Sequence, residues 1–179
     1  MAPSRLITVG HSNRSLEELV ARLGSAGVQA VADVRSSPFS RYSPQFNRDR
    51  LAGALKAAGI EYVWLGEQLG GRPPEDRLYD ASGRVDYAAL AEHPRFLAGL
   101  ARLRAGMAKY RLAVLCSEED PVRCHRRSLI GYLLSNEGVL LEHLRADGQL
   151  EEEIGVGLPP GPWRSLRPVR PGVAQGREA

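Results

Sequence analysis

The side chains best suited to chemistry lie together in Cys124-His125-Arg126, directly before an apolar run over residues 128–134. That run predicts a helix over about residues 124–136. A helix start has unpaired N–H groups and a partial positive charge, which bind anions and lower the pKa of a thiol. The imidazole and the guanidinium add a proton acceptor and a fixed positive charge. The pattern predicts an anion site with Cys124 as a candidate nucleophile.

Three further side chains are candidates for proton transfer. His11 titrates near neutral pH and could act as a general acid or base, or could simply be a hydrogen-bonded histidine. Asp33 could orient His11, or it could form a buried ion pair with Arg35. Glu118 is a possible acid or base, the alternative being a solvated loop carboxylate. The catalytic set predicted from the sequence is His11, Asp33, Glu118 and Cys124.

Arginines dominate the predicted binding set, since Arg offers paired donors that match phosphate or carboxylate oxygens. The Gly70-Gly71 pair permits close approach of the backbone to a ligand, although it is neither a P-loop nor a dinucleotide fingerprint. The residues expected to bind the anion are Ser12, Arg35, Arg41, Gly70, Gly71, Arg72, His125 and Arg126. No cofactor is expected.

The spacing of the two cysteines argues against several sites. A phosphatase-type loop needs Arg six positions after Cys, and the sixth position after Cys116 is Val122. His11, Cys116, Cys124 and His125 could bind zinc in principle, but structural zinc sites usually show paired ligands two to four residues apart. We therefore expect no metal. A reversible Cys116–Cys124 disulfide requires the intervening loop to fold back.

The elements that must position these residues alternate between strands and helices. Strands are predicted at residues 6–9, 28–34, 60–65, 111–116 and 139–144, and helices at 15–27, 47–59, 87–110 and about 124–136, with a break at 93–94. This alternation predicts a single three-layer α/β domain: a mainly parallel sheet of about five strands with helices on both faces. Right-handed crossovers bring the C-terminal strand ends to one edge, where ligands bind in open α/β sheets.

Composition divides the chain into a body and a tail. Residues 1–156 are expected to form the domain, and the Pro/Gly/Arg-rich residues 157–179 to be mostly disordered, with Trp163 against the body. The tail holds four arginines and one glutamate, which accounts for the net charge of +3. The body is therefore neutral, and the basic balance is weak support for nucleic-acid binding.

The chain shows no export or membrane signal. No apolar run approaches the roughly 20 residues that span a bilayer. The first five residues lack the apolar core of a signal peptide. Two cysteines in this context suggest free thiols in a reducing compartment. We expect a cytoplasmic protein without membrane contact.

Four motifs resemble one known family. GHSNRSLEELVARL, DVRSSPFSRYSPQFN, LGEQLGGR and LCSEEDPVRCHRRSL follow one another within residues 6–150, as in the domain-of-unknown-function family 488. The resemblance implies a compact α/β domain of bacteria and archaea and implies no particular reaction. The family's recurring positions correspond to Gly10, His11, Ser12, Asp33, Arg35, Pro38, Ser40, Phe46, Gly70, Gly71, Arg72, Cys116, Cys124, His125 and Arg126.

The leading hypothesis is a hydrolase or transferase that acts on a phosphorylated or nucleotide-like anionic substrate at the C-terminal edge of the sheet. A non-catalytic module that binds a nucleotide or nucleic acid through the same arginines remains open. A thiol redox-responsive protein using Cys116 and Cys124 is a further alternative. The sequence does not give the oligomeric state.

Overall fold

The computed structural model describes residues 2–153, 155–158 and 161–170. Its centre is a six-stranded sheet of order β3-β2-β4-β1-β5-β6. The first five strands along the chain pair in parallel and β6 pairs antiparallel with β5, which confirms the predicted mainly parallel α/β fold. The strands are β1 (Arg5–Gly10), β2 (Ala30–Asp33), β3 (Glu61–Trp64), β4 (Leu112–Cys116), β5 (Leu140–Leu144) and β6 (Leu150–Glu153).

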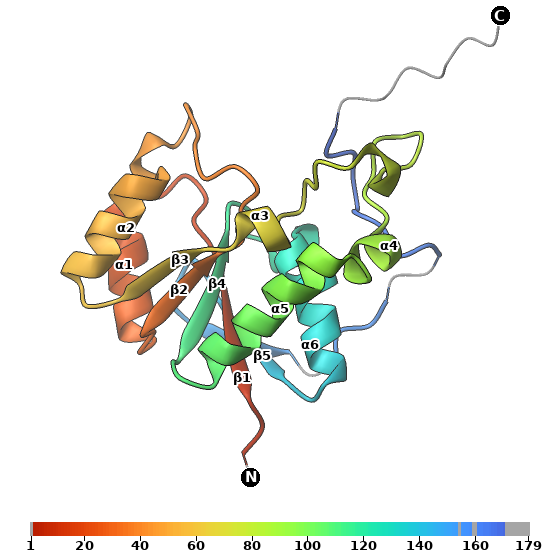
Figure 1. The fold of residues 1–179 in the computed structure, drawn as a ribbon. Helices are drawn as coiled ribbons and strands as arrows, with labels where there is room; N and C mark the ends of the chain where they lie inside the picture. The colour runs from red at the N-terminus through yellow and green to blue at the C-terminus, as the bar shows by residue number, and fades with distance from the viewer. Residues whose placement is uncertain (1, 154, 159–160, 171–179) are drawn as a thin grey trace, which may run out of the picture.

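Helices cover both faces of the sheet (Figure 1). The α-helices are α1 (Leu16–Ser25), α2 (Arg48–Ala57), α3 (Gly66–Leu69), α4 (Tyr87–Ala91), α5 (Pro94–Met107) and α6 (Tyr132–Asn136). A π-helix, η4 (Arg126–Gly131), runs directly into α6. Single 3-10 turns are η1 (Pro44–Phe46), η2 (Asp76–Leu78) and η3 (Pro121–Arg123). The three-layer arrangement agrees with the prediction.

Two apolar cores hold the layers together. On one face, Leu19 of α1 and Leu55 of α2 pack against Val9 and Leu115 of the sheet. On the other face, helices α5, η4 and α6 pack against residues such as Val114. Strand β4 alternates its side chains between these cores, because successive residues of a strand point to opposite faces. A strand buried on both faces holds the segments at its end in fixed positions.

Local sequence explains the helix starts. Ser15 and Glu18 form the predicted capping box at α1, each side chain bonding the backbone of the other residue. His93 caps α5 through a bond from the Arg95 amide, and Pro94 occupies the first helical position. The structure therefore confirms the predicted break between α4 and α5 at His93-Pro94.

Two predicted features differ from the structure. The helix expected from residue 124 begins at Arg126 and its first six residues are π-helical, because Cys124 closes the preceding turn η3. Strand β6 was not predicted, since Leu150-Glu151-Glu152-Glu153 reads as polar. It is an edge strand, and Glu152 and Glu153 are paired with Arg5 and Arg127.

Residues 161–170 lie against the body, which differs from the expected disorder over that stretch. Trp163 packs edge-on against Tyr87 and Tyr132, and its Nε1–H donates to the carbonyl of Ser128 at 2.8 Å. Ser165 is buried and accepts from the Val85 amide. The expectation for residues 171–179 lies outside the described residues. Within the described part of the chain, no helix combines the length and apolar character needed to cross a bilayer.

Candidate functional site

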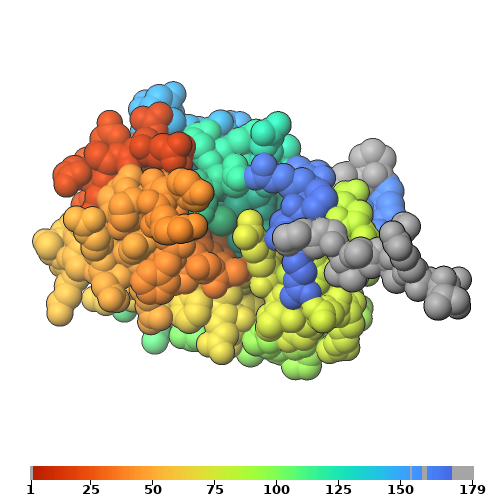
Figure 2. Space-filling view, turned by 90° about the horizontal axis from the view of Figure 1, so that it is seen from above, coloured from red at the N-terminus to blue at the C-terminus, as the bar shows by residue number. Residues whose placement is uncertain are grey.

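A cavity of about 1290 Å³ opens at the C-terminal edge of the sheet. Figure 2 looks onto this edge, with the loop after β2 on one side of the segment after β4 and residues 161–170 on the other. The loops after β1, β2 and β4 all contribute to its walls, as predicted for a parallel sheet. Residues 165–169, which belong to the tail in sequence, complete the lining.

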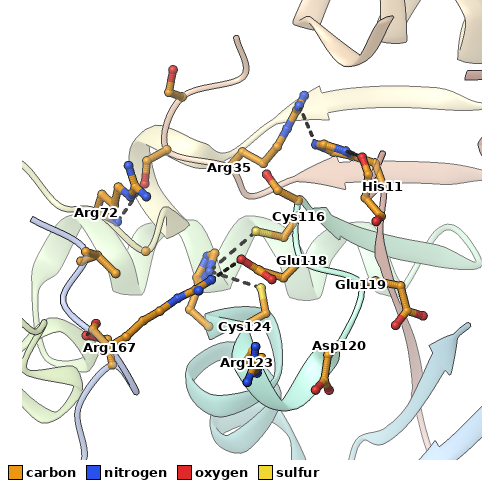
Figure 3. Close-up of a pocket in the computed structure, with 18 of the residues that line it drawn as sticks. His11, Arg35, Arg72, Cys116, Glu118, Glu119, Asp120, Arg123, Cys124 and Arg167 are labelled. Atoms are coloured by element: carbon orange, nitrogen blue, oxygen red, sulfur yellow. Dashed lines mark hydrogen bonds and ion pairs between the residues drawn. The ribbon is translucent and has the colours of Figure 1, made fainter. Parts of the chain in front are cut away.

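Cys116, Cys124 and His125 form a buried cluster in the wall of this cavity (Figure 3). His125 Nδ1 lies 4.0 Å from the sulfur of Cys116 and 3.8 Å from the sulfur of Cys124. The three potential ligand atoms all lie within 4.8 Å of one another. His125 Nε2 is 3.0 Å from the carbonyl oxygen of Leu69. This carbonyl can only accept, so it assigns a ring hydrogen to Nε2 and leaves Nδ1 facing both sulfurs.

The two thiols have opposite pKa shifts. The contact with Cys124, followed by burial, raises the pKa of Cys116 well above its ordinary value. Burial also acts to raise the pKa of Cys124, but the contacts with Cys116 and His125 and the charge of Arg126 lower it overall. The charge of Arg126 thus favours a thiolate in this pair, and Cys124 remains the candidate nucleophile.

The cluster forms because the loop after β4 folds back. Cys116 ends β4, and Asp120 caps η3 by accepting from the Val122 amide. The Cys124 amide donates to the carbonyl of Pro121 at 3.1 Å. The Cys124 amide is therefore paired within the protein and is not free to bind an anion. The loop between Cys116 and Cys124 thus folds back, as contact between the two cysteines requires.

The glycine pair serves internal packing. A Cβ on Gly71 would lie 3.0 Å from the His125 ring, so glycine lets that ring reach its position. A Cβ on Gly70 would overlap the Ser36 side chain. Of the two, only Gly71 lines the cavity. The glycine pair thus allows the backbone to approach side chains of the protein itself, and Gly70 does not line the cavity.

His11, Arg35 and Asp33 form a second group. Arg35 is paired with Asp33, its Nη2 lying 2.7 Å from Oδ2, and its Nη1 approaches His11 Nε2 at 3.4 Å. Asp33 is fully buried, also accepts from Tyr62, and does not line the cavity, whereas His11 and Arg35 do. Asp33 therefore holds Arg35, which was the alternative interpretation of that carboxylate.

His11 is neutral at neutral pH. Its Nδ1 lies 2.7 Å from the Ser12 carbonyl, and its ring stacks on Phe46 at 4.3 Å. Burial, with a smaller contribution from the Arg35 charge, lowers the pKa of His11 to about 4. Proton transfer by His11 stays a prediction. In the structure its Nε2 is an acceptor directed at Arg35, which positions that guanidinium at the cavity wall.

Two arginines of the predicted binding set are not available to an anion there. Arg126 is only 1% exposed, and its guanidinium donates to Thr8 Oγ1 and to the carbonyls of Glu118 and Glu119. Arg41 is exposed and does not line the cavity. Arg126 instead holds the loop after β4 in its folded-back position. Burial of a guanidinium with neutral acceptors has no signature in sequence.

Other arginines take their place at the cavity. Arg72 is an exposed lining residue, as predicted, and Arg123 is a second one that sequence reasoning left unassigned. Neither has a carboxylate partner among the residues the structure describes. Arg167 also lines the cavity and pairs with Glu118. The position of Arg123 directly before Cys124 is the signal that could have found it, whereas Arg167 comes from the tail.

The two other residues of the predicted set, Ser12 and Glu118, both line the cavity. Ser12 lines it, with a φ of 51° that is unusual for a residue other than glycine. Glu118 lines it, but its carboxylate is engaged with Arg167. The cavity thus combines the buried Cys116–Cys124–His125 cluster with two arginines that have no carboxylate partner in the part of the chain that the structure describes. This arrangement can bind an anionic group beside a thiolate or beside a metal ion held by the cluster.

The motifs that build this site are those of a known family. A family model described as "Domain of unknown function DUF488" matches residues 15–133, about two thirds of the chain. The match includes Arg35, Arg72 and the cysteine–histidine cluster, while His11 and Ser12 precede it. No curated protein and no solved structure matches the chain. The extent of the family match shows that the chain belongs to the family of unknown function DUF488.

Proposed function

We propose that the protein is an enzyme, a hydrolase or transferase, that acts on a phosphorylated or nucleotide-like anionic substrate in this cavity. The observation that carries the proposal is the presence of Arg72 and Arg123, both without carboxylate partners among the described residues, in one cavity with the Cys116–Cys124–His125 cluster. Charged groups that bind and groups that react are thus brought to one place.

The charges around the cavity favour an anion. Three acidic side chains line it, and each is engaged: Glu118 with Arg167, Glu119 with Arg145, and Asp120 with the Val122 amide. The bond to the Val122 amide leaves the charge of Asp120 in place, so Arg72 and Arg123 against this one carboxylate leave an excess of one positive charge. A guanidinium fork binds two oxygens of a phosphate at once, which fixes the orientation of the group.

Aromatic side chains at the cavity support a nucleotide-like ligand. Tyr42 is 91% exposed and Phe39 is 60% exposed, and both line the cavity. Large exposed aromatic rings beside positive charge can stack on a nucleobase while the arginines hold its phosphate. The same surface would accept the end of a nucleic-acid strand.

Binding is the first part of the test. Thermal shift and calorimetry with phosphate, sulfate, sugar phosphates, nucleoside monophosphates and a short DNA strand should identify a stabilising class. We expect Arg72→Ala and Arg123→Ala each to weaken the binding of that ligand at least about tenfold, which is about 1.4 kcal/mol of binding free energy. Arg41→Ala is the matched control, because Arg41 is exposed outside the cavity. An equal loss in the control, or no stabilising ligand, would contradict the proposal.

Turnover is the second part. Cys124→Ser should retain binding of the stabilising class and lose hydrolysis or transfer of the corresponding ester, since the arginines are untouched. A non-catalytic binding module would show the same affinity in both proteins and no turnover in either. Product formation is followed by chromatography, so that the reaction type need not be assumed.

A thiol redox-responsive protein is the second candidate. The sulfurs of Cys116 and Cys124 lie within 4.8 Å of each other, so a small movement of the η3 loop would join them. With hydrogen peroxide as the oxidant, two thiols would give one disulfide and two molecules of water. A free-thiol count that falls from two to zero on mild peroxide treatment and recovers with a reductant would favour this candidate.

A further inference from the structure

We infer that Cys116, Cys124 and His125 form a binding site for one zinc ion, with a fourth coordination position open to the cavity. These residues supply two sulfur atoms and one imidazole nitrogen, all within 4.8 Å of one another. Thiolate and imidazole are the ligands that zinc prefers, and a site with three protein ligands leaves one position for water or substrate. The metal site stands on this geometry, and only its role toward substrate rests on the proposed function.

The distances suit a shared ion. Zinc bonds of about 2.3 Å to sulfur and 2.0–2.1 Å to nitrogen place these atoms about 3.6 Å apart in a tetrahedral site. The observed separations between His125 Nδ1 and the two sulfurs are 3.8 Å and 4.0 Å. Small side-chain rotations would close the difference.

The histidine is oriented as a metal ligand. Its Nε2–H donates to the Leu69 carbonyl, so its lone pair on Nδ1 is directed at the sulfurs. A metal-bound histidine usually makes this kind of bond with its other ring nitrogen, and the bond fixes the ring orientation. Packing of the ring against Gly71 holds it from the other side. The ligand is therefore preorganised by two elements outside the cluster.

The surroundings narrow the choice of metal. No carboxylate belongs to the cluster among the described residues, which disfavours magnesium and calcium, because they require oxygen ligands. An ion with two thiolates has no net charge and can be held at a buried site. All three residues line the cavity, so the fourth position is accessible from it.

The sequence makes the assignment testable, because the chain has only two cysteines and four histidines. The full-length protein is treated with a chelator under reducing conditions and then titrated with Co²⁺ as a spectroscopic substitute for Zn²⁺. We expect a thiolate-to-cobalt charge-transfer band that saturates at one equivalent and is displaced by one equivalent of Zn²⁺. No charge-transfer band in the wild-type protein would overturn the inference.

Variants assign the ligands. Cys116→Ser, Cys124→Ser and His125→Gln should each weaken cobalt binding beyond the 10–100-fold typical of outer-shell changes. His93→Asn is the matched control, since it removes a histidine outside the cluster and keeps an acceptor at the start of α5. A cobalt affinity that is unchanged in Cys124→Ser, or that falls as far in His93→Asn, would overturn the assignment.

A wild-type measurement guards against variants that fold poorly. Bound zinc should protect both thiols of the wild-type protein from alkylation, and unprotected thiols at saturating zinc would contradict the site. Anion binding is then measured with and without metal. Metal binding without any anion ligand would leave the zinc site standing and contradict the proposed function, while anion binding without metal would do the reverse.

Discussion

The Nε2 of His125 lies 3.0 Å from the carbonyl oxygen of Leu69, which joins the segment after β3 to the cluster after β4. Leu69 is the last residue of α3, and the two glycines that follow it allow Ser36 and His125 to pack closely. The Gly-Gly motif and the Cys-His motif are therefore two halves of one arrangement. Changes in either half are expected to alter the same imidazole.

Gly10→Ala should destabilise the fold strongly. A Cβ at Gly10 would overlap the backbone carbonyl of Glu118, which cannot move without displacing the loop held by Arg126. We expect a loss of more than about 3 kcal/mol in the free energy of unfolding, measured by urea denaturation. Gly53→Ala is the control, because it lies within α2 with open space around it and should stabilise by about 0.5–1 kcal/mol. Similar stabilities for the two variants would contradict this description.

Arg126 and Arg123 should separate stability from binding. Arg126→Ala leaves the part-buried carbonyls of Glu118 and Glu119 without their donor and empties a buried site, and should cost about 2–3 kcal/mol of unfolding free energy. Arg123 is exposed, so Arg123→Ala should change the free energy of unfolding by less than about 0.5 kcal/mol while it weakens anion binding. Urea denaturation and calorimetry on the same preparations measure both. A stable Arg126→Ala variant that had lost anion binding would return Arg126 to the binding set.

The Glu75–Arg95 pair should give a pH-dependent contribution to stability. Hydrogen bonds from Arg95 lower the pKa of Glu75 from 4.5 to about 2. Because the folded pKa is below the unfolded one, the stabilisation is present above pH 4.5 and is lost as the pH falls toward 2. Arg95→Met should therefore cost about 1 kcal/mol at pH 7, a value reduced by solvent screening, and much less near pH 2.5.

The control for this pair lies on the same helix. The guanidinium of Arg102 donates to the neutral side chain of Gln68, so Arg102→Met should give a difference from wild type that is independent of pH. Denaturation at both pH values measures all three proteins. An equal cost of Arg95→Met at the two pH values would show that the pair contributes no linked protonation.

Trp163 should anchor residues 161–170 to the body. Its ring contacts Tyr132 at a centroid distance of 4.8 Å, and its Nε1–H is bonded to Ser128. Trp163→Ala should weaken this attachment by about 2 kcal/mol, below the cost at a fully buried site. Faster proteolytic cleavage within residues 157–170 is the readout. Leu158→Ala, at a half-exposed leucine, should leave the rate unchanged, and equal rates in both variants would contradict the anchoring role.

The sequence by itself determined the local elements and the edge at which polar side chains gather. Short apolar runs predicted the parallel strands, and Ser15-Leu16-Glu17-Glu18 and His93-Pro94 marked two helix starts. These signals depend on neighbours within a few residues, so they can be read along the chain. Strand β6 was not predicted, because its three consecutive glutamates are typical of a loop.

Only the tertiary structure decided which side chains of that edge meet. Cys116 and Cys124 come together because the η3 turn folds back. The guanidinium of Arg126 donates to the carbonyls of that loop, so it is not available to bind an anion. Arg167 reaches the cavity from a segment that reads as a tail. Burial and pairing depend on residues distant in sequence. For that reason the sequence could nominate chemically capable residues, while the fold selected those that share one cavity.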